Sequence, residues 1–306
     1  MSILVMTTIS VIIPTRGKHS LLQEVCATLL VQNGIETGEI EIIIVGDGLE
    51  EPEKLCFTDQ ALPLKIHYER REHKGPASAR NYGAALSSSP LLLFLGNDTK
   101  AMPDLLSSHV QFHDQHQNCA CLGKIRNPEH LKPNHLERFL NQGSQFHFPE
   151  KDGLLDFWHF YTANISVPRS LFMELGGFRE EFPAAGWEDS EFGYRFSKKY
   201  HIRYHSQAEV IHVHPVTLES FKSRQRQLGR DAHLLLDIHP ELDTFFKIRH
   251  YPIRRILKCF LSSSAPRRVL LALYPFIEKL AYSRIVHYYF RILRYHFFFA
   301  GYQENS

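Results

Sequence analysis

Short runs of consecutive apolar residues alternate with longer segments of mixed polarity along the first hundred residues. Each run ends in a turn or polar segment, and four are predicted strands: residues 10–14, 41–45, 64–68 and 91–95. Two intervening segments carry apolar residues at helical spacing: residues 21–32 and 76–86. Near-continuous apolar strands separated by helices are typical of a parallel sheet between helical layers. The pattern therefore predicts an α/β fold with a mostly parallel central sheet flanked by helices.

The second half of the chain is less regular. Residues 157–167 contain alternating runs, and residues 191–200 have the periodicity of a helix. Residues 210–214 alternate in polarity, so that His212 and His214 share one face if this segment is a strand. From residue 218 onward we expect a helical and basic extension.

Composition changes this picture mainly at the C-terminus. Of the 306 residues, 43% are hydrophobic and 22% are charged, which is ordinary for a globular protein. Residues 246–306 hold 11 Lys and Arg against two acids, whereas the preceding residues hold 24 against 31. A basic tail on an acidic body suggests an anionic surface as a partner, either membrane headgroups or nucleic acid.

The scattered cysteines and the short length of the apolar runs indicate the cellular compartment. The five cysteines are scattered, without a second pair at zinc-site spacing, which fits a reducing environment. The first ten residues have no charged segment before their apolar run, so we expect no signal peptide. No uncharged run approaches the ~18–20 apolar residues of a spanning helix. We therefore expect a cytoplasmic protein.

Seven motifs follow one another between residues 10 and 229. They are SVIIPTRG, IIIVGDG, HKGPASARNYGAA, LLLFLGNDTKAMPD, TANISVPRSLFMELGGFREEFP, GWEDSEFGYR and AEVIHVHP. In this order and at these spacings they resemble the family-2 glycosyltransferases with the GT-A nucleotide-sugar-binding fold. The resemblance implies a Rossmann-like GT-A domain at about residues 8–220, followed by a helical extension at residues 221–306.

The resemblance also implies metal ligands. A divalent cation stabilises the growing charge of a diphosphate leaving group, and such cations prefer carboxylate oxygen, Mn²⁺ accepting imidazole as well. Aligned with the family, Asp98 takes the last position of the D-x-D motif and His212 the histidine position, with His214 two residues on. The expected ion is Mn²⁺ or Mg²⁺. Gly96 stands where the first acid is usual, and from spacing alone Asp98 could be only a turn residue.

Donor binding is implied at the ends of the predicted strands, where ligands of such sheets bind. The candidates are Pro14, Thr15, Arg16, Asp47, Arg80, Asn81, Asn97 and Asn164. A strand-end carboxylate such as Asp47 can accept from a nucleobase N–H, although Gly46 replaces the family's first acid there. The Arg80 guanidinium could pair with the diphosphate or equally with an acid of its own domain. The donor expected is a UDP-, GDP- or dTDP-sugar.

Catalysis is assigned by the resemblance to the segment Trp187-Glu188-Asp189. An acid of the E-D motif deprotonates the acceptor hydroxyl in the inverting members, which makes Asp189 the expected base and Glu188 the reserve. Trp187 offers an apolar face for an acceptor sugar. The alternative is that these acids only stabilise the start of a helix through its dipole.

The basic tail has two interpretations. Arg284, His287, Arg291 and Arg294 recur at helical spacing, and aromatic residues crowd the end of the chain. Such a helix fits a peripheral anchor on anionic lipid, and it fits equally well a helical subdomain packed on the catalytic domain. Nucleic-acid binding is not expected, because the body is acidic and no recognition motif is present.

The expected function is metal-dependent transfer of a sugar to a hydroxyl of a glycan or lipid-linked acceptor. The role that fits best is polysaccharide or glycolipid assembly for the cell envelope at the inner face of the cytoplasmic membrane. Two alternatives stay open. One is a nucleotidyltransferase-like enzyme acting on nucleotide diphosphates, and the other is an inactive nucleotide-sugar-binding module, which the glycines at positions 46 and 96 would permit.

Overall fold

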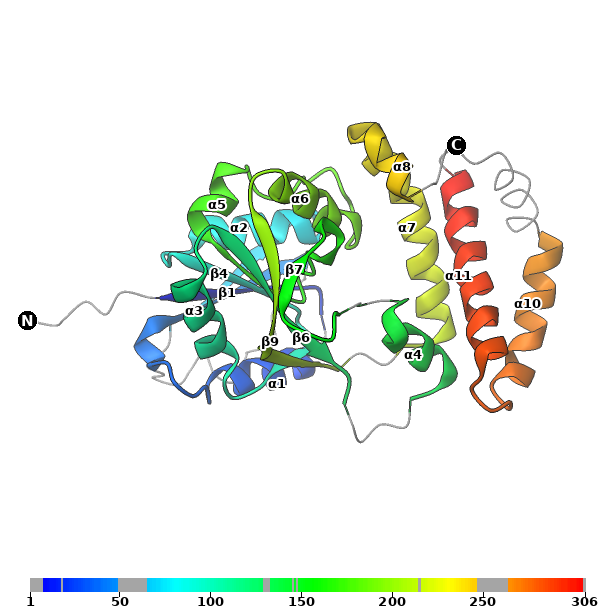
Figure 1. Cartoon of the computed structure of the whole chain (residues 1–306), viewed down its shortest axis with the longest axis horizontal. Helices are drawn as coiled ribbons and strands as arrows, with labels where there is room; N and C mark the ends of the chain where they lie inside the picture. The colour runs from blue at the N-terminus through cyan, green and yellow to red at the C-terminus, as the bar shows by residue number, and fades with distance from the viewer. Residues whose placement is uncertain are drawn as a thin grey trace, which may run out of the picture. The chain divides into compact units, whose positions relative to one another are not determined.

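The computed structural model divides the chain into two compact units (Figure 1). The first comprises Met1–Glu129 and Phe146–His214, and the second His130–Gln145 and Pro215–Ser306. The structure describes residues 8–17, 19–48, 65–128, 133–144, 146, 148–213, 216–246 and 264–304. The predicted boundary at residue 220 stays a prediction. That residues 130–145 group with the C-terminal helices was not anticipated from the sequence.

Four parallel strands form one half of the sheet in the first unit. In sheet order they are β3 (Lys65–Arg71), β2 (Ile40–Asp47), β1 (Ile9–Thr15) and β4 (Leu91–Leu95). Every residue of β2 and β4 is buried, as the unbroken apolar runs predicted. These strands and the helices between them confirm the α/β prediction.

The other half of the sheet is mixed. Beyond β4 the order continues with β8 (Asn164–Pro168), β6 (Cys119–Arg126), β9 (His201–His212) and β5 (Thr99–Ala101), and β7 (Gly153–Leu155) pairs with β9. β8 runs antiparallel to both β4 and β6, whereas β6 and β9 are parallel. β9 is much longer than the predicted strand at residues 210–214. It begins at His201 because its buried positions alternate through Ile202 and Tyr204 as well.

Helices cover both faces of this sheet. Leu22 and Val25 of α1 (His19–Leu29) join Leu105 of α3 (Leu105–Gln115) in one core cluster. The helices of the opposite cluster are α2 (Pro76–Leu86), α5 (Arg169–Glu174) and α6 (Trp187–Ser197). The short helical turns of the unit are η1 (Thr37–Glu39) and η3 (Phe157–His159). Helix α6 begins four residues before the predicted start, directly after Gly186, whose φ of +145° suits glycine alone.

The second unit is helical, which confirms the predicted C-terminal helices. Its elements are α4 (His135–Phe139), η2 (Leu140–Ser144), α7 (Leu218–Ile238), η4 (Pro240–Leu242), α8 (Asp243–Phe246), α10 (Ser264–Ile277) and α11 (Arg284–Glu304). Phe139, Phe221 and Phe290 lie in a shared core. Gly229 of α7 and Gly301 of α11 let the two backbones approach closely. One face of the basic helix α11 is therefore packed within its own unit. No helix in the described part of the chain is long and apolar enough to cross a membrane.

Candidate functional site

The carboxyl ends of the parallel strands carry the first group of site residues. Thr15 ends β1, and Asn97 lies in the turn after β4. The Asn97 side-chain amide donates to Thr15 Oγ1 over 3.1 Å. Two adjacent parallel strands thus present linked polar side chains at the edge where ligands of such sheets bind.

Asp47, the last residue of β2, is 6% exposed and holds the loop that precedes α2. Its Oδ1 accepts from the Lys74 amide at 2.8 Å, its Oδ2 accepts from the Gly75 amide at 3.2 Å, and His73 Nδ1 lies 2.8 Å from Oδ2. Gly75 has a φ of +88°, and a side chain there would meet the Pro183 carbonyl oxygen at 2.9 Å. The Asp47 carboxylate therefore fixes the loop before α2. Only glycine at position 75 lets this loop pass so close to the Pro183 carbonyl. A direct nucleobase contact by Asp47 stays a prediction.

Asp98 and His212 are brought together by the pairing of β5 with β9. Thr99 lies opposite His212 in this antiparallel pair, and the Val213 amide donates to the Asp98 carbonyl at 2.7 Å. His212 Nε2 is 3.6 Å from Asp98 Oδ1, with the two side chains 10% and 19% exposed. Two atoms each about 2.1 Å from one ion can be this far apart, so carboxylate and imidazole fit a Mn²⁺ or Mg²⁺ ion.

Asp98 and His212 are the predicted metal ligands that the structure brings together among the described residues. No group of three His, Cys, Asp or Glu side chains is close enough for a metal within the ranges that the structure covers. His214, the further predicted ligand, lies outside the described residues. The remaining ligands of an ion here would have to come from the diphosphate or from water.

Asp189 lies in the first turn of α6, and Thr162 lies within hydrogen-bonding distance of its carboxylate. The Thr162 amide donates to Oδ2 at 3.1 Å, and the Thr162 hydroxyl lies 3.0 Å from Oδ1 and 2.8 Å from Oδ2. Burial and the neighbouring Glu188 raise the pKa of Asp189 to about 7, against the lowering effects of Arg80 and Thr162. The side chain is 18% exposed. This carboxyl group is poised to accept a proton near neutral pH.

Glu188, the neighbour of Asp189 in the first turn of α6, is fully buried. Arg80 Nη1 donates to its Oε1 at 3.0 Å and lies 3.7 Å from Asp189 Oδ1, while the Gly186 amide donates to its Oε2. Of the two partners considered for Arg80, the structure places it on acids of its own domain. Its Nε–H has no acceptor among the described residues, so one donor of this 91%-buried guanidinium is not used within them.

A backbone contact connects the two carboxylate sites. The Gly96 amide donates to the Ala163 carbonyl at 3.3 Å. This bond joins the turn that carries Asp98 to the segment in which Thr162 holds Asp189. One backbone hydrogen bond therefore links the turn that carries Asn97 and Asp98 to the segment that holds Asp189.

Two other predicted donor-binding residues make contacts within the protein. Asn164 is completely buried, its Nδ2 donates to the carbonyls of Lys124 and Ala208, and its Oδ1 lies 3.0 Å from His109 Nε2, so it ties strands to α3. Asn81 bonds to the backbone of Phe178 and thereby fixes the turn after α5. Both side chains therefore hold segments of the fold in place.

The three remaining candidates flank the site in the sequence. Pro14 is half-buried and Arg16 is exposed, on either side of Thr15. Trp187 is half-buried at the start of α6, one residue before Glu188. Their roles in binding donor and acceptor stay predictions. Thr162 was not among the predicted residues, although its position two residues before Asn164 in TANIS was a usable signal.

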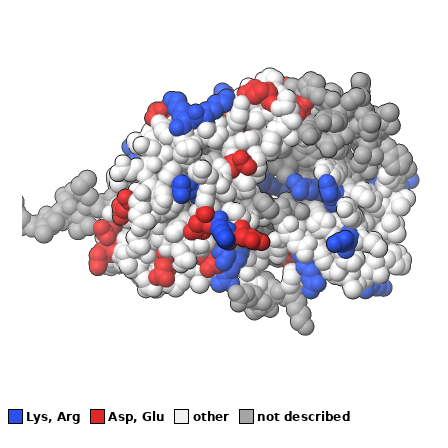
Figure 2. Space-filling model, viewed as in Figure 1, with Lys and Arg blue, Asp and Glu red and all other residues white. Residues whose placement is uncertain are grey.

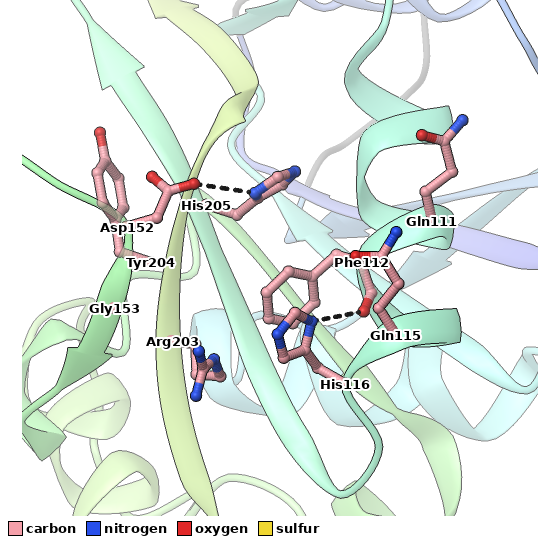
Figure 3. Close-up of a pocket in the computed structure, with 9 residues that line it drawn as sticks. All are labelled: Gln111, Phe112, Gln115, His116, Asp152, Gly153, Arg203, Tyr204 and His205. Carbon is pink, nitrogen blue, oxygen red and sulfur yellow. Dashed lines mark hydrogen bonds and ion pairs between the residues drawn. The ribbon is translucent and has the colours of Figure 1, made fainter.

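A pocket lies away from this site, between α3 and the first half of β9 (Figure 3). His205 Nδ1 is 3.2 Å from Asp152 Oδ2 there, and the His116 ring stacks on Phe112 at 4.5 Å. His205 precedes His212 by seven residues of strand, which corresponds to roughly 20 Å. The pocket has mixed charge and takes no part in the arrangement described above.

Comparisons with known proteins agree with the geometry. Residues 10–176 match the family described as Glycosyl transferase family 2. Validoxylamine A glucosyltransferase from Streptomyces hygroscopicus subsp. limoneus is 31% identical over 214 residues, covering 61% of this chain and 47% of that protein. Chondroitin synthase from Escherichia coli is 24% identical over 229 residues, covering 64% of this chain and 33% of that protein. The chain thus spans about half or less of the length of these curated relatives.

A solved structure shows the same fold. S. aureus TarS 1–349 in complex with UDP superposes with a TM-score of 0.55 over 98% of this chain and 92% of that one, at 18% identity. The likeness to a nucleotide-bound protein of this architecture supports the GT-A assignment of the sheet.

Proposed function

The chain belongs to glycosyl transferase family 2, and from this premise we propose that it transfers a sugar from a nucleotide-diphosphate sugar to a hydroxyl group, with Asp189 as general base. The observation that carries the proposal is the Asp189 carboxylate, which Thr162 orients and whose pKa lies at about 7. A group with this pKa takes a proton at neutral pH and releases it afterwards.

In the proposed reaction Asp189 accepts the proton of the acceptor hydroxyl as that oxygen attacks the anomeric carbon. The new glycosidic bond forms while the bond from that carbon to the diphosphate oxygen breaks, and the electron pair leaves with the nucleoside diphosphate. Attack from the face opposite the leaving group inverts the anomeric centre. The Glu188–Arg80 pair keeps the start of α6 in place, since both side chains are buried against each other.

Asp98 and His212 are the residues that would hold a divalent cation. When bound, the cation stabilises the negative charge that develops on the diphosphate. Gly96 leaves the turn without a second carboxylate, so Asp98 alone supplies the protein's negative charge to the ion within the described part of this turn.

Donor recognition is proposed for the strand ends. Thr15 and Asn97 present a hydroxyl and an amide at this edge, and the Arg80 Nε–H is a donor with no acceptor among the described residues. UDP-sugars are the first class to test because TarS was solved with UDP. The acceptor we propose is a glycan or lipid-linked glycan of the cell envelope, reached by a protein held peripherally at the inner face of the cytoplasmic membrane.

A thermal-shift panel of nucleotide sugars, with and without Mn²⁺, tests the binding half of this proposal. Stabilisation by one donor only in the presence of the metal is expected, since a ligand that binds the native state alone raises its stability. Asp98→Asn should abolish the metal-dependent part of the shift. Binding of no nucleotide sugar by the native protein, under either condition, would overturn the proposal.

A further inference from the structure

Exposed apolar side chains are concentrated on two adjacent helices of the second unit. Of the thirteen large hydrophobic residues that are exposed in the described chain, eight lie in or directly after α10 and along α11. They are Val269, Leu273, Phe276, Leu280, Ile285, Tyr288, Ile292 and Tyr295, with 41% to 74% of their surface exposed. We call these eight residues the hairpin face. Isolated exposed apolar residues are normal, but a contiguous group indicates a contact surface.

The spacing of these residues places them in one stripe per helix. Positions 269, 273 and 276 of α10 and positions 285, 288, 292 and 295 of α11 follow steps of three and four. The two helices form an antiparallel hairpin (Figure 1) and pack through other positions, where the Tyr289 hydroxyl donates to the Leu270 carbonyl at 2.7 Å. Around the axis of each helix, the exposed stripe lies about 120° from the face that packs on the other helix, in the same direction of rotation for both helices. In an antiparallel pair this brings both stripes to the same side.

The charges around the hairpin face have one sign. Arg268, Lys279, Arg284 and Arg291 are exposed on the same two helices and the turn between them, and the Arg291 guanidinium lies 5.9 Å from the Tyr295 ring centre. The acids of the described residues 264–304 are Glu278, which is half-buried, and Glu304, which is bound to Arg226 and Arg230 of α7. In Figure 2 the part of the view that holds α10 and α11 shows Lys and Arg on a mostly uncharged surface.

We propose that the hairpin face docks on an anionic lipid bilayer, with its aliphatic and aromatic side chains inserted at headgroup depth and its four cations on acidic headgroups. A second copy of the chain is the less suitable occupant, because a symmetric pair would bring the cations of one copy against those of the other. A bilayer accepts Tyr rings and Arg side chains together at its interface and supplies the counter-charge.

Vesicle flotation of the full chain tests this surface without measuring activity, so its outcome is independent of the proposed reaction. The chain should float with phosphatidylcholine vesicles that contain phosphatidylglycerol and bind weakly to phosphatidylcholine alone. Arg284→Gln with Arg291→Gln should lower the partition coefficient on anionic vesicles roughly 30-fold, at about 1 kcal/mol per cation. Ile285→Ser with Ile292→Ser should lower it by roughly tenfold or more.

The matched control is Val31→Ser with Leu154→Ser, which removes two exposed apolar residues of the first unit. This variant should float like the native chain. Circular dichroism shows whether each variant is folded, which is expected because all the substituted side chains are exposed. The proposal is overturned if the native chain does not float with anionic vesicles, or if the hairpin variants float as well as the control. It is also overturned if sedimentation velocity shows a dimer that the hairpin variants dissociate while no chain binds vesicles.

Discussion

Thr162→Val is the sharpest test of how the protein controls its proposed base. The substitution keeps the backbone amide that donates to Asp189 and removes the hydroxyl that lies 2.8 Å and 3.0 Å from the two carboxylate oxygens. A hydrogen bond to a charged group is worth about 1.5–3 kcal/mol. Because one pKa unit corresponds to about 1.4 kcal/mol, losing this bond should raise the pKa of Asp189 by about one to two units.

The sign follows from the role of the group. A base works only when ionised, so the activity of the native protein should fall as the pH drops below about 7. In Thr162→Val this acidic limb of kcat/KM should move upward by about one to two units. The variant should therefore lose roughly 5- to 50-fold at pH 7, where the native base is half ionised, and regain most of its activity in alkaline buffer.

The assay is the pH profile of kcat/KM for nucleotide-sugar turnover. Thr244→Val, which removes a hydroxyl that donates to the Glu241 carbonyl in the second unit, is the control and should leave the profile unchanged. An unmoved limb, or a loss of the same size at every pH, would refute the link between Thr162 and the base.

Three further predictions concern the fold and the metal. Gly301→Ala places a methyl group 1.9 Å from the Arg226 carbonyl oxygen and should cost at least about 1–3 kcal/mol in denaturant unfolding, whereas Gly153→Ala, with no atom within 4 Å, should be neutral. Glu188→Ala leaves the buried Arg80 without its partner and should lower the free energy of unfolding by about 3–5 kcal/mol, measured in urea; full stability would refute the pair. Asp98→Asn should weaken Mn²⁺-dependent donor binding in calorimetry by at least tenfold.

Stability should also depend on the ionisation of Asp189, with a definite sign. Its pKa is raised in the folded protein, so the stability that its protonated form contributes is complete below about pH 4 and is lost as the pH rises through about 7. Asp189→Asn, which carries no charge to bury, should therefore have a higher Tm than the native chain at pH 8 and a smaller difference at pH 4. Equal differences at both pH values would contradict a raised pKa.

The sequence was most informative where one physical effect dominated. The strands β2 and β4 were predictable because burial on both sides leaves an unbroken apolar run. Helix α2 was predicted with its observed bounds, since Pro76 follows a glycine that caps the helix. β6 has no such unbroken apolar run, because it carries a glycine and a lysine among its apolar residues. Its pairing with β9 also depends on parts of the chain that are distant in sequence.

Side-chain roles were harder to predict because they depend on tertiary partners. The sequence left Arg80 between a diphosphate and an acid, and only packing of α2 against α6 brings it to Glu188. Asn164 is a polar residue of a kind common in binding sites. It is buried where β8, β6 and β9 lie side by side, and its side chain links these strands by hydrogen bonds. Thr162 contacts Asp189 because the chain before β8 passes the start of α6; the TANIS motif marks this segment, but the contact itself depends on the fold.

The central claim is that Asp189 accepts the acceptor proton during sugar transfer, and Asp189→Asn tests it most directly. Donor binding by calorimetry and turnover by release of nucleoside diphosphate are measured on the same preparation. The account predicts donor binding within about twofold of the native chain and turnover reduced by about 10²–10⁴-fold, the usual contribution of a general base. Turnover at the native rate with unchanged binding would contradict it.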